Sequence, residues 1–256
     1  MPKNWTEPEL WVAMNVYCRL PFGQFDKSNR HIKAVAEQME RTPSSLAMKL
    51  SNLASLDSYH QQRGVAGLKG ASNLDRKVWN DFQQDWATMA ERSESAFEAL
   101  MHGQAPVSTE PSKLPTVPEG PTEVQRRVKV RRVQGFFRKA ILGSYESRCA
   151  LTDLAVPELL IASHIIGWSE NEARRADPTD GICLNALHDK AFDRHLLTFD
   201  EDYRVVLSSA LKSKEAPEFQ SYNFGGLEGK PLRLPHRFLP DPVALSKHRE
   251  IFSKSA

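Results

Sequence analysis

The chain has 256 residues, which suits two small domains better than one large one, and a net charge of only +2. It begins without an apolar secretory signal and contains no apolar run of about eighteen residues that would span a bilayer. Its three cysteines include no Cys-x-x-Cys pair, so a disulfide framework is excluded and we expect a soluble cytoplasmic protein with reduced thiols.

Helical periodicity dominates the amino-terminal part of the chain. Apolar residues recur at helical spacing over residues 7–19 and again over residues 29–40, which predicts two amphipathic helices. Thr42 is a good N-cap, and Pro43 fits the first helical position, where its missing amide proton costs nothing. A third helix should therefore start there, with its leucines facing inward.

The second and third predicted helices, joined by a tight turn, resemble a helix-turn-helix unit. The third helix would then offer Ser44, Ser45 and Lys49 to DNA. An ordinary three-helix bundle with solvated polar faces is the alternative. The glycine-rich residues 63–72 would form a tight loop or a small wing, and a further helix is expected over residues 73–100.

A change of composition marks a boundary between domains. Gly103 to Pro121 contains five prolines among Ser, Thr, Glu and Gly, with almost nothing apolar to bury. We therefore predict a helical DNA-reading domain over 1–102, a proline-rich linker over 103–123 and a second domain over 124–256.

The second domain opens with a basic stretch. Eight Lys or Arg residues stand between Arg126 and Arg148 against the single acid Glu146. A solvated basic face is the ordinary explanation, but this stretch leads directly into a segment with two histidines, where phosphate charge would need neutralising. We expect a helix over 131–143, with DNA contacts from Arg131, Arg132, Arg138 and Lys139, and further DNA contacts from Arg174 and Arg175.

The two histidines, His164 and His188, lie twenty-four residues apart in that segment. Residues 159–164 read as a buried strand, residues 169–181 as a surface loop, and Asn185 as the N-cap of a helix through residue 193. This order would bring both imidazoles to one point. Taken singly, either histidine is more often structural.

The residues after this segment predict two further elements of secondary structure. Residues 196–208 alternate about an Asp-Glu-Asp turn, which predicts a hairpin, and residues 241–252 predict a final packing helix. His236 and His248 are expected to be surface or structural residues. Cys149 and Cys183 would fit a structural zinc site with a histidine, although buried hydrophobic positions explain them more simply.

Four phrases stand out in this part of the chain: Cys149-Ala-Leu-Thr-Asp, Ala162-Ser-His-Ile-Ile-Gly-Trp-Ser, Gly181-Ile-Cys-Leu-Asn-Ala-Leu-His-Asp-Lys-Ala-Phe-Asp and Leu197-Thr-Phe-Asp. Together they resemble the HNH nucleases, whose core is a two-stranded ribbon and a helix that hold one divalent metal. The resemblance covers about residues 145–208 and is closest to a bacterial restriction-type branch. It implies an α+β protein with a ββα-metal domain, in which Asp180 takes the place of the loop asparagine.

The chemistry of phosphodiester hydrolysis explains these residue types. A neutral histidine can accept the proton of the attacking water, so His164 is the expected general base, with Asp180 and Asn185 supporting it. A divalent cation offsets the charge that builds on the phosphoryl oxygens. The resemblance makes His188 its ligand and implies Mg²⁺ or a transition ion such as Mn²⁺, Co²⁺ or Ni²⁺.

Two positions depart from the family pattern. Ser163 stands where a second metal ligand is common, so Asp189, Asp193 or water held by Ser163 would complete the coordination, although neither aspartate shares a helical face with His188. Asp180 can only accept hydrogen bonds when ionised, so backbone amides, Arg174 or Arg175 would have to hold the loop.

The leading hypothesis is a restriction-type DNA endonuclease that cuts double-stranded DNA as a homodimer and possesses a separate reading domain. A requirement for modified cytosine is compatible with that organisation. The alternative is a DNA-binding regulator with a decayed nuclease domain, because Ser163 and Asp180 replace stronger family residues. An RNA substrate fits less well, because a helix-turn-helix suits the major groove of DNA.

Overall fold

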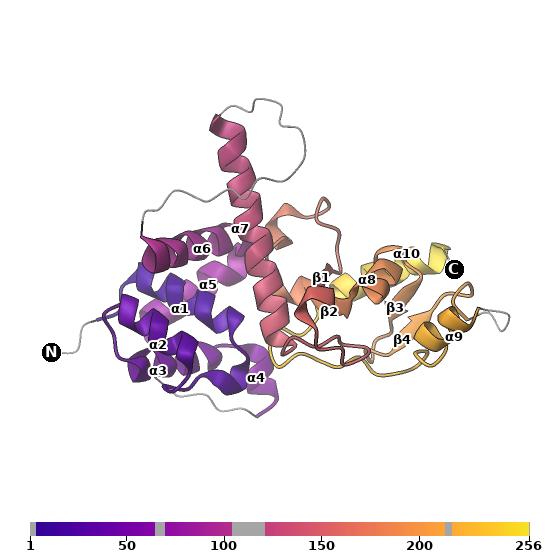
Figure 1. Ribbon diagram of the computed structural model, residues 1–256, viewed down its shortest axis with the longest axis horizontal. Helices are drawn as coiled ribbons and strands as arrows, with labels where there is room; N and C mark the ends of the chain where they lie inside the picture. The colour runs from indigo at the N-terminus through magenta and orange to yellow at the C-terminus, as the bar shows by residue number, and fades with distance from the viewer. Residues whose placement is uncertain (1–3, 65–69, 104–120, 213–216, 256) are drawn as a thin grey trace. The chain divides into compact units, whose positions relative to one another are not determined.

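The computed structural model describes residues 4–64, 70–103, 121–212 and 217–255, and these residues divide into two compact units, Met1–Phe137 and Arg138–Ala256. Figure 1 shows helices throughout the first unit and two small sheets in the second. The combination is the mixed α and β architecture that the sequence predicts. None of the helices described is long and apolar enough to cross a membrane.

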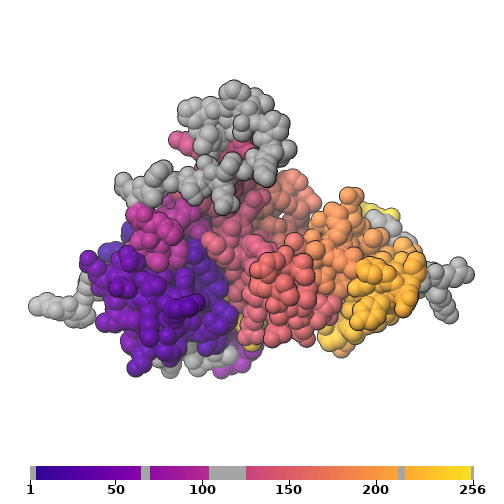
Figure 2. All heavy atoms as spheres, in the orientation of Figure 1, coloured from indigo at the N-terminus to yellow at the C-terminus, as the bar shows by residue number. Residues whose placement is uncertain are grey.

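Unit 1 is a helical bundle. Its helices are α1 (Glu7–Arg19), α2 (Arg30–Gln38), α3 (Pro43–Ala54), α4 (Ser58–Gln62), α5 (Asn73–Gln84), α6 (Trp86–His102) and the first part of α7 (Pro121–Ser144), with a 3-10 turn at Phe22–Gln24. In the space-filling view its indigo and violet atoms form one continuous mass (Figure 2). The core is fully buried and includes Leu10, Tyr17, Ile32, Leu46, Leu50 and Phe82.

The predicted helix starts of unit 1 are confirmed. The Thr42 hydroxyl accepts a hydrogen bond from the Ser45 amide at 3.2 Å, and Pro43 occupies the first position of α3. The single helix predicted over residues 73–100 is wrong. Asp85 leaves helical geometry and caps α6 by accepting from the Thr88 amide, so two helices form.

The boundary between the predicted domains is only partly described. Most of the linker predicted over 103–123, and residues 65–69 of the predicted wing, lie outside the described residues. Residues 121–123 belong to α7, which starts ten residues before the helix expected over 131–143. The linker and the wing therefore stay predictions.

Unit 2 contains two antiparallel two-stranded sheets and several helices. Its strands are β1 (Leu160–His164), β2 (Gly181–Asn185), β3 (Leu197–Phe199) and β4 (Val205–Leu207), and its remaining helices are α8 (Ala186–Asp193), α9 (Glu218–Phe224) and α10 (Pro242–Ser255). Short 3-10 turns lie at Pro157–Leu159, Glu172–Arg174 and Pro178–Asp180. The strand, hairpin and final helix expected from the sequence are confirmed.

The core of unit 2 joins the first sheet to α8. Leu160, Ile182, Leu184 and Phe192 are fully buried, together with Phe199 of β3. Residues of β1 and β2 are thus held against one face of α8, and this packing places the side chains of the candidate site.

Candidate active site

The ends of β1 and β2 form the frame of the site. Their register pairs Ser163 with Ile182 and His164 with Gly181, and α8 begins immediately after β2. The Arg138 guanidinium donates to the carbonyls of Leu160 at 2.7 Å and of Pro157, so it fixes the start of β1. Arg138 thus has a structural role, and its predicted DNA contact stays a prediction.

His164 is half-buried at the end of β1, with Nε2 at 3.1 Å from the Arg175 carbonyl oxygen. Burial lowers the pKa of His164, while the hydrogen bond to Arg175 and the charge of Asp193 raise it. A carbonyl oxygen only accepts, so in the neutral ring Nε2 carries the proton and the lone pair lies on Nδ1. The ring can therefore accept a proton at neutral pH.

Asp189 and Asp193 lie one turn apart on α8, which places them on one helical face toward β1. Burial raises the pKa of Asp189, as does the charge of Asp193, whereas Ser163 and Lys190 lower it. The buried Ser163 hydroxyl is close enough to act on this carboxyl, yet it makes no hydrogen bond of standard geometry with the described residues. Asp189 is thus influenced by Ser163 of β1, and the charge of Asp193 acts on both Asp189 and His164.

His188 lies on a different face of α8 from Asp189 and Asp193, and the expectation that both imidazoles meet at one point stays a prediction. Its Nδ1 accepts from the Asn185 amide nitrogen at 3.1 Å, its Nε2 donates to the Asn223 carbonyl at 3.2 Å, and its ring packs edge-on against Phe224. The His188 residue is 1 % exposed, and none of these three interactions involves His164. The physical reason is helix geometry, because the face of α8 that carries the two aspartates cannot also carry His188.

Asn185 works as a cap. Its side-chain oxygen accepts from the His188 amide at 2.9 Å, as its predicted position before α8 requires. Its backbone amide also donates to the Cys149 sulfur at 3.3 Å. Burial raises the pKa of Cys149, but interactions with His188, Thr152 and the backbone amides of Leu151 and Asn185 bring it down to about 7.

The two cysteines of unit 2 are both fully buried and unoxidised. Burial raises the pKa of Cys183 to about 12, with the charge of Cys149 acting in the same direction. Within the described ranges, no group of three or more His, Cys, Asp or Glu side chains is arranged to hold a metal. The structure gives no support to a cysteine zinc site.

Asp180 braces the loop between the strands. It is 1 % exposed, its carboxylate accepts from the Ile166 amide at 3.2 Å, and its carbonyl accepts from the Ile165 amide. Burial raises the pKa of Asp180 to about 7, the charge of Asp177 adds to this, and Arg174 opposes it. Arg174 itself binds Asp241 at 2.7 Å, which makes it part of the same brace.

The side chains predicted to contact DNA fall into two groups in the structure, those paired with internal carboxylates and those at the surface. Lys49 is buried, with its ammonium bonded to both carboxylate oxygens of Asp75, and Arg132 pairs with Glu91 and Glu98, so these cations are committed within unit 1. The side chains that remain at the surface, wholly or partly, are Ser44, Ser45, Arg131 and Lys139.

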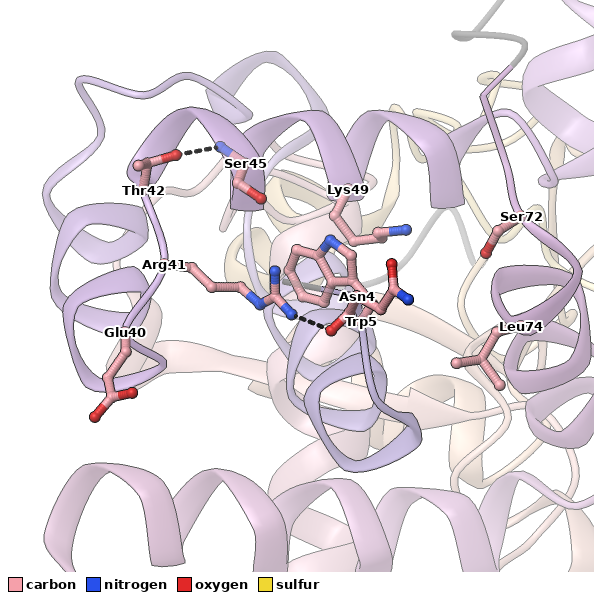
Figure 3. A pocket seen from close by; sticks show the side chains of 9 residues that line it. All are labelled: Asn4, Trp5, Glu40, Arg41, Thr42, Ser45, Lys49, Ser72 and Leu74. Carbon is pink, nitrogen blue, oxygen red and sulfur yellow. Dashed lines mark hydrogen bonds between the residues drawn. The ribbon is translucent and has the colours of Figure 1, made fainter. Parts of the chain in front are cut away.

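Unit 1 also contains a cavity of about 750 Å³ at the start of α3. Figure 3 shows Trp5 between Arg41 and Lys49, with the Arg41 guanidinium 4.0 Å from the Trp5 ring centroid. Arg41 is bonded to Glu9 and to the Asn4 carbonyl, and Lys49 to Asp75. Both cations of the cavity wall are thus neutralised by internal carboxylates.

The fold and site define a ββα unit with a histidine at the end of its first strand. Residues 149–200 match the family model described as HNH endonuclease. The matched region contains β1, β2, α8 and β3, and it supports assignment of this part of the chain to the HNH family. No match to the chain was found among curated proteins.

Sequence reasoning missed the residues that hold the two histidines. Trp168 packs edge-on against His164, and Asn223 of α9 binds His188. The spacing of Asp189 and Asp193 was a usable signal for the carboxylate pair. Nothing in the sequence indicated that the Arg175 carbonyl would be the partner of His164.

Proposed function

We propose that this protein is a metal-dependent DNA endonuclease of restriction type, which hydrolyses phosphodiester bonds with His164 as general base. The observation that carries the proposal is His164 at the end of β1, held at its Nε2 by the Arg175 carbonyl, with a pKa that burial lowers and the charge of Asp193 raises. The match of residues 149–200 to the HNH endonuclease family supports the same reaction class.

A divalent metal fits the carboxylate side of the site. Asp189 and Asp193 offer oxygen ligands on one helical face, and the buried Ser163 hydroxyl is an orphaned polar atom beside them. Oxygen donors of this kind favour Mg²⁺ or Mn²⁺ over softer ions. We therefore assign metal binding to Asp189 and Asp193 with Ser163, rather than to His188. When bound, the cation would offset negative charge on the phosphoryl oxygens.

The chain's own residues then perform the proton transfer. Nδ1 of His164 takes the proton of the water that attacks phosphorus, while Nε2–H stays on the Arg175 carbonyl. As the new P–O bond forms, the bond from phosphorus to the leaving sugar oxygen breaks, and that oxygen takes up a proton from solvent. Asp180 holds the loop that carries this carbonyl in place through its bonds to Ile165 and Ile166.

The remaining parts of the proposal concern the whole protein. The helical domain would read DNA through the exposed start of α3, where Ser44 and Ser45 lie, and a homodimer would cut both strands. Dependence on modified cytosine is compatible with a separate reading domain of this kind. Cytoplasmic location is compatible with a substrate of foreign DNA.

A plasmid assay tests the proposal. Purified protein is incubated with methylated and unmethylated plasmid in the presence of Mg²⁺, Mn²⁺, Co²⁺ or Ni²⁺. Removal of a general base should slow cleavage by about 10²–10⁴-fold, so His164→Ala should be nearly inactive. His102→Ala changes an exposed histidine of unit 1 and should match the wild type. Intact plasmid in every condition, with wild type and His164→Ala alike, would refute the proposal.

One observation favours a second function, a DNA-binding regulator without nuclease activity. In the described residues the site lacks a group of three charged or thiol ligands, and Ser163 supplies only a neutral hydroxyl. Retained DNA affinity without metal uptake in calorimetry would select this function.

A further inference from the structure

Two residues of the loop after β1 make contacts that end on His164. The Trp168 ring lies edge-on to the imidazole, with centroids 5.5 Å apart and planes at 83°. The Arg175 guanidinium donates from Nε to the Trp168 carbonyl at 2.8 Å and lies 5.1 Å from the centroid of its ring. The Arg175 carbonyl in turn accepts from His164. These contacts close a ring of three residues.

The position of the Arg175 carbonyl determines which nitrogen of the His164 ring carries the proton. A neutral imidazole with Nε2–H has its lone pair on Nδ1, and the opposite tautomer has it on Nε2. An acceptor placed at Nε2 stabilises the first form over the second. Because the Arg175 side chain is tied to Trp168, the peptide that carries this acceptor is fixed by the residue's own guanidinium.

Arg174 ties the neighbouring part of the loop to Asp241 and Thr179, but the Arg175 side chain has few partners besides Trp168. Residues 169–175 are exposed or half-buried, and the Arg175 bond to Glu172 at 2.7 Å involves a carboxylate that is 83 % exposed. Exposed ion pairs contribute little to conformational stability. The contacts with Trp168 are more sheltered, because both side chains of that pair are partly buried.

We propose that Trp168 and Arg175 form a clamp that holds His164 in the Nε2–H tautomer and points Nδ1 toward the reacting phosphate. Both are positioning residues, since they act through His164. Arg175 is thereby assigned to the clamp instead of to DNA. The link to catalysis depends on the proposed nuclease function, whereas the tautomer itself does not.

Nitrogen-15 NMR of the full-length protein with labelled histidines tests the clamp directly. Ring nitrogen shifts at pH 8, without added metal, distinguish the tautomers, and the signals of His164 are those lost in His164→Gln. The wild type should show Nε2–H alone. Trp168→Ala and Arg175→Ala should each show a mixture of tautomers, and kcat should fall about 10–100-fold with KM unchanged.

The control and the conservative variants sharpen the test. Glu172→Gln removes only the exposed partner of Arg175 and should leave the tautomer and kcat as in the wild type. Trp168→Phe and Arg175→Lys retain one contact each, so they should fold and show smaller shifts in the same direction. A pure Nε2–H signal in all four clamp variants would overturn the clamp. A clamp confirmed by NMR in a protein that cuts no DNA would instead refute the nuclease function.

Discussion

At the scale of single residues, Asp180 is the clearest example of a carboxyl group whose charged form is disfavoured by burial. It stands in unit 2 at 1 % exposure, and its pKa is raised to about 7 by burial. The folded state therefore binds a proton that the unfolded state releases between about pH 4 and pH 7. Ionisation of Asp180 lowers stability across that range, and the full cost is present above pH 7.

We predict that Asp180→Asn stabilises the protein at alkaline pH. The amide oxygen can still accept from the Ile166 amide, and no charge is buried, so the free energy of unfolding should rise by about 1–4 kcal/mol at pH 8. The gain should shrink toward pH 5. Urea unfolding of variant and wild type at both pH values measures it. A difference that does not depend on pH would contradict the explanation.

Measurements of metal affinity test whether the proposed ligands are the two carboxylates or His188. Asp189→Asn and Asp193→Asn should each raise the Kd for Mn²⁺ by about tenfold or more, because each removes a charged oxygen donor. His188→Gln should leave the Kd unchanged, since the His188 nitrogens bind Asn185 and Asn223. Calorimetric titration of folded protein gives all three values. Loss of binding in His188→Gln alone would restore the ligand first expected from the sequence.

These residues also show what the sequence could not reveal. The motif identified His164 and the fourth and eighth residues of α8, Asp189 and Asp193, because spacing along one helix is a local property. The direction of His188 depended on Asn223, thirty-five residues later in the chain. A partner so distant leaves no periodic signal.

At the scale of elements, a buried histidine joins α10 to β3 and α8. His248 of α10 donates from Nε2 to the Phe192 carbonyl at 3.0 Å, and its Nδ1 lies 2.9 Å from the Thr198 hydroxyl. Its ring stacks on Phe192 with centroids 3.9 Å apart. Burial lowers the pKa of His248 to about 4, and the nearby His195 adds to the effect.

The lowered pKa predicts a stability loss in acid. The unfolded chain binds a proton at His248 near pH 6.5, and the folded protein resists it until about pH 4, so this stability is present above pH 6.5 and is lost as the pH falls to 4. The loss should be about 3 kcal/mol. Thermal or urea unfolding of wild type and His248→Gln at pH 7.5 and 4.5 isolates it, because other titrating groups cancel in the difference. Equal pH dependence of both proteins would disprove this assignment.

The prediction of helices and strands succeeded where the structure of a segment depends on its own residues. Capping residues located α3 and α8, and alternation located β3 and β4. The residues of β2 gave no strand pattern of their own, because Gly181–Asn185 is buried at nearly every position and acquires its register from β1. The break at Asp85 was missed because Asp is acceptable within a helix and its capping role needs Thr88.

At the scale of the whole molecule, the charge distribution differs from the one that the sequence suggests. The basic stretch before the HNH region appeared available for DNA, but Arg132 is occupied by Glu91 and Glu98, and Arg138 by backbone carbonyls. Their acceptors lie nineteen or more residues away in the sequence, so no local pattern distinguishes them from exposed cations. Arg131 is exposed and lacks a partner among the described residues, which leaves it as the clearest remaining candidate for a DNA contact.

The oligomeric state of the proposed nuclease can be determined by mixing active and inactive chains. If the protein is a homodimer with one active site for each strand, mixed dimers of wild type and His164→Ala cut one strand only. An excess of the variant should then convert the main plasmid product from linear DNA to nicked circles, while light scattering reports twice the monomer mass. A monomer that cuts twice would produce the same ratio of linear to nicked DNA at every mixture, and only the rate would fall. His102→Ala, mixed in the same proportions, should leave both the ratio and the rate unchanged, which shows that dilution by an altered chain is not itself the cause.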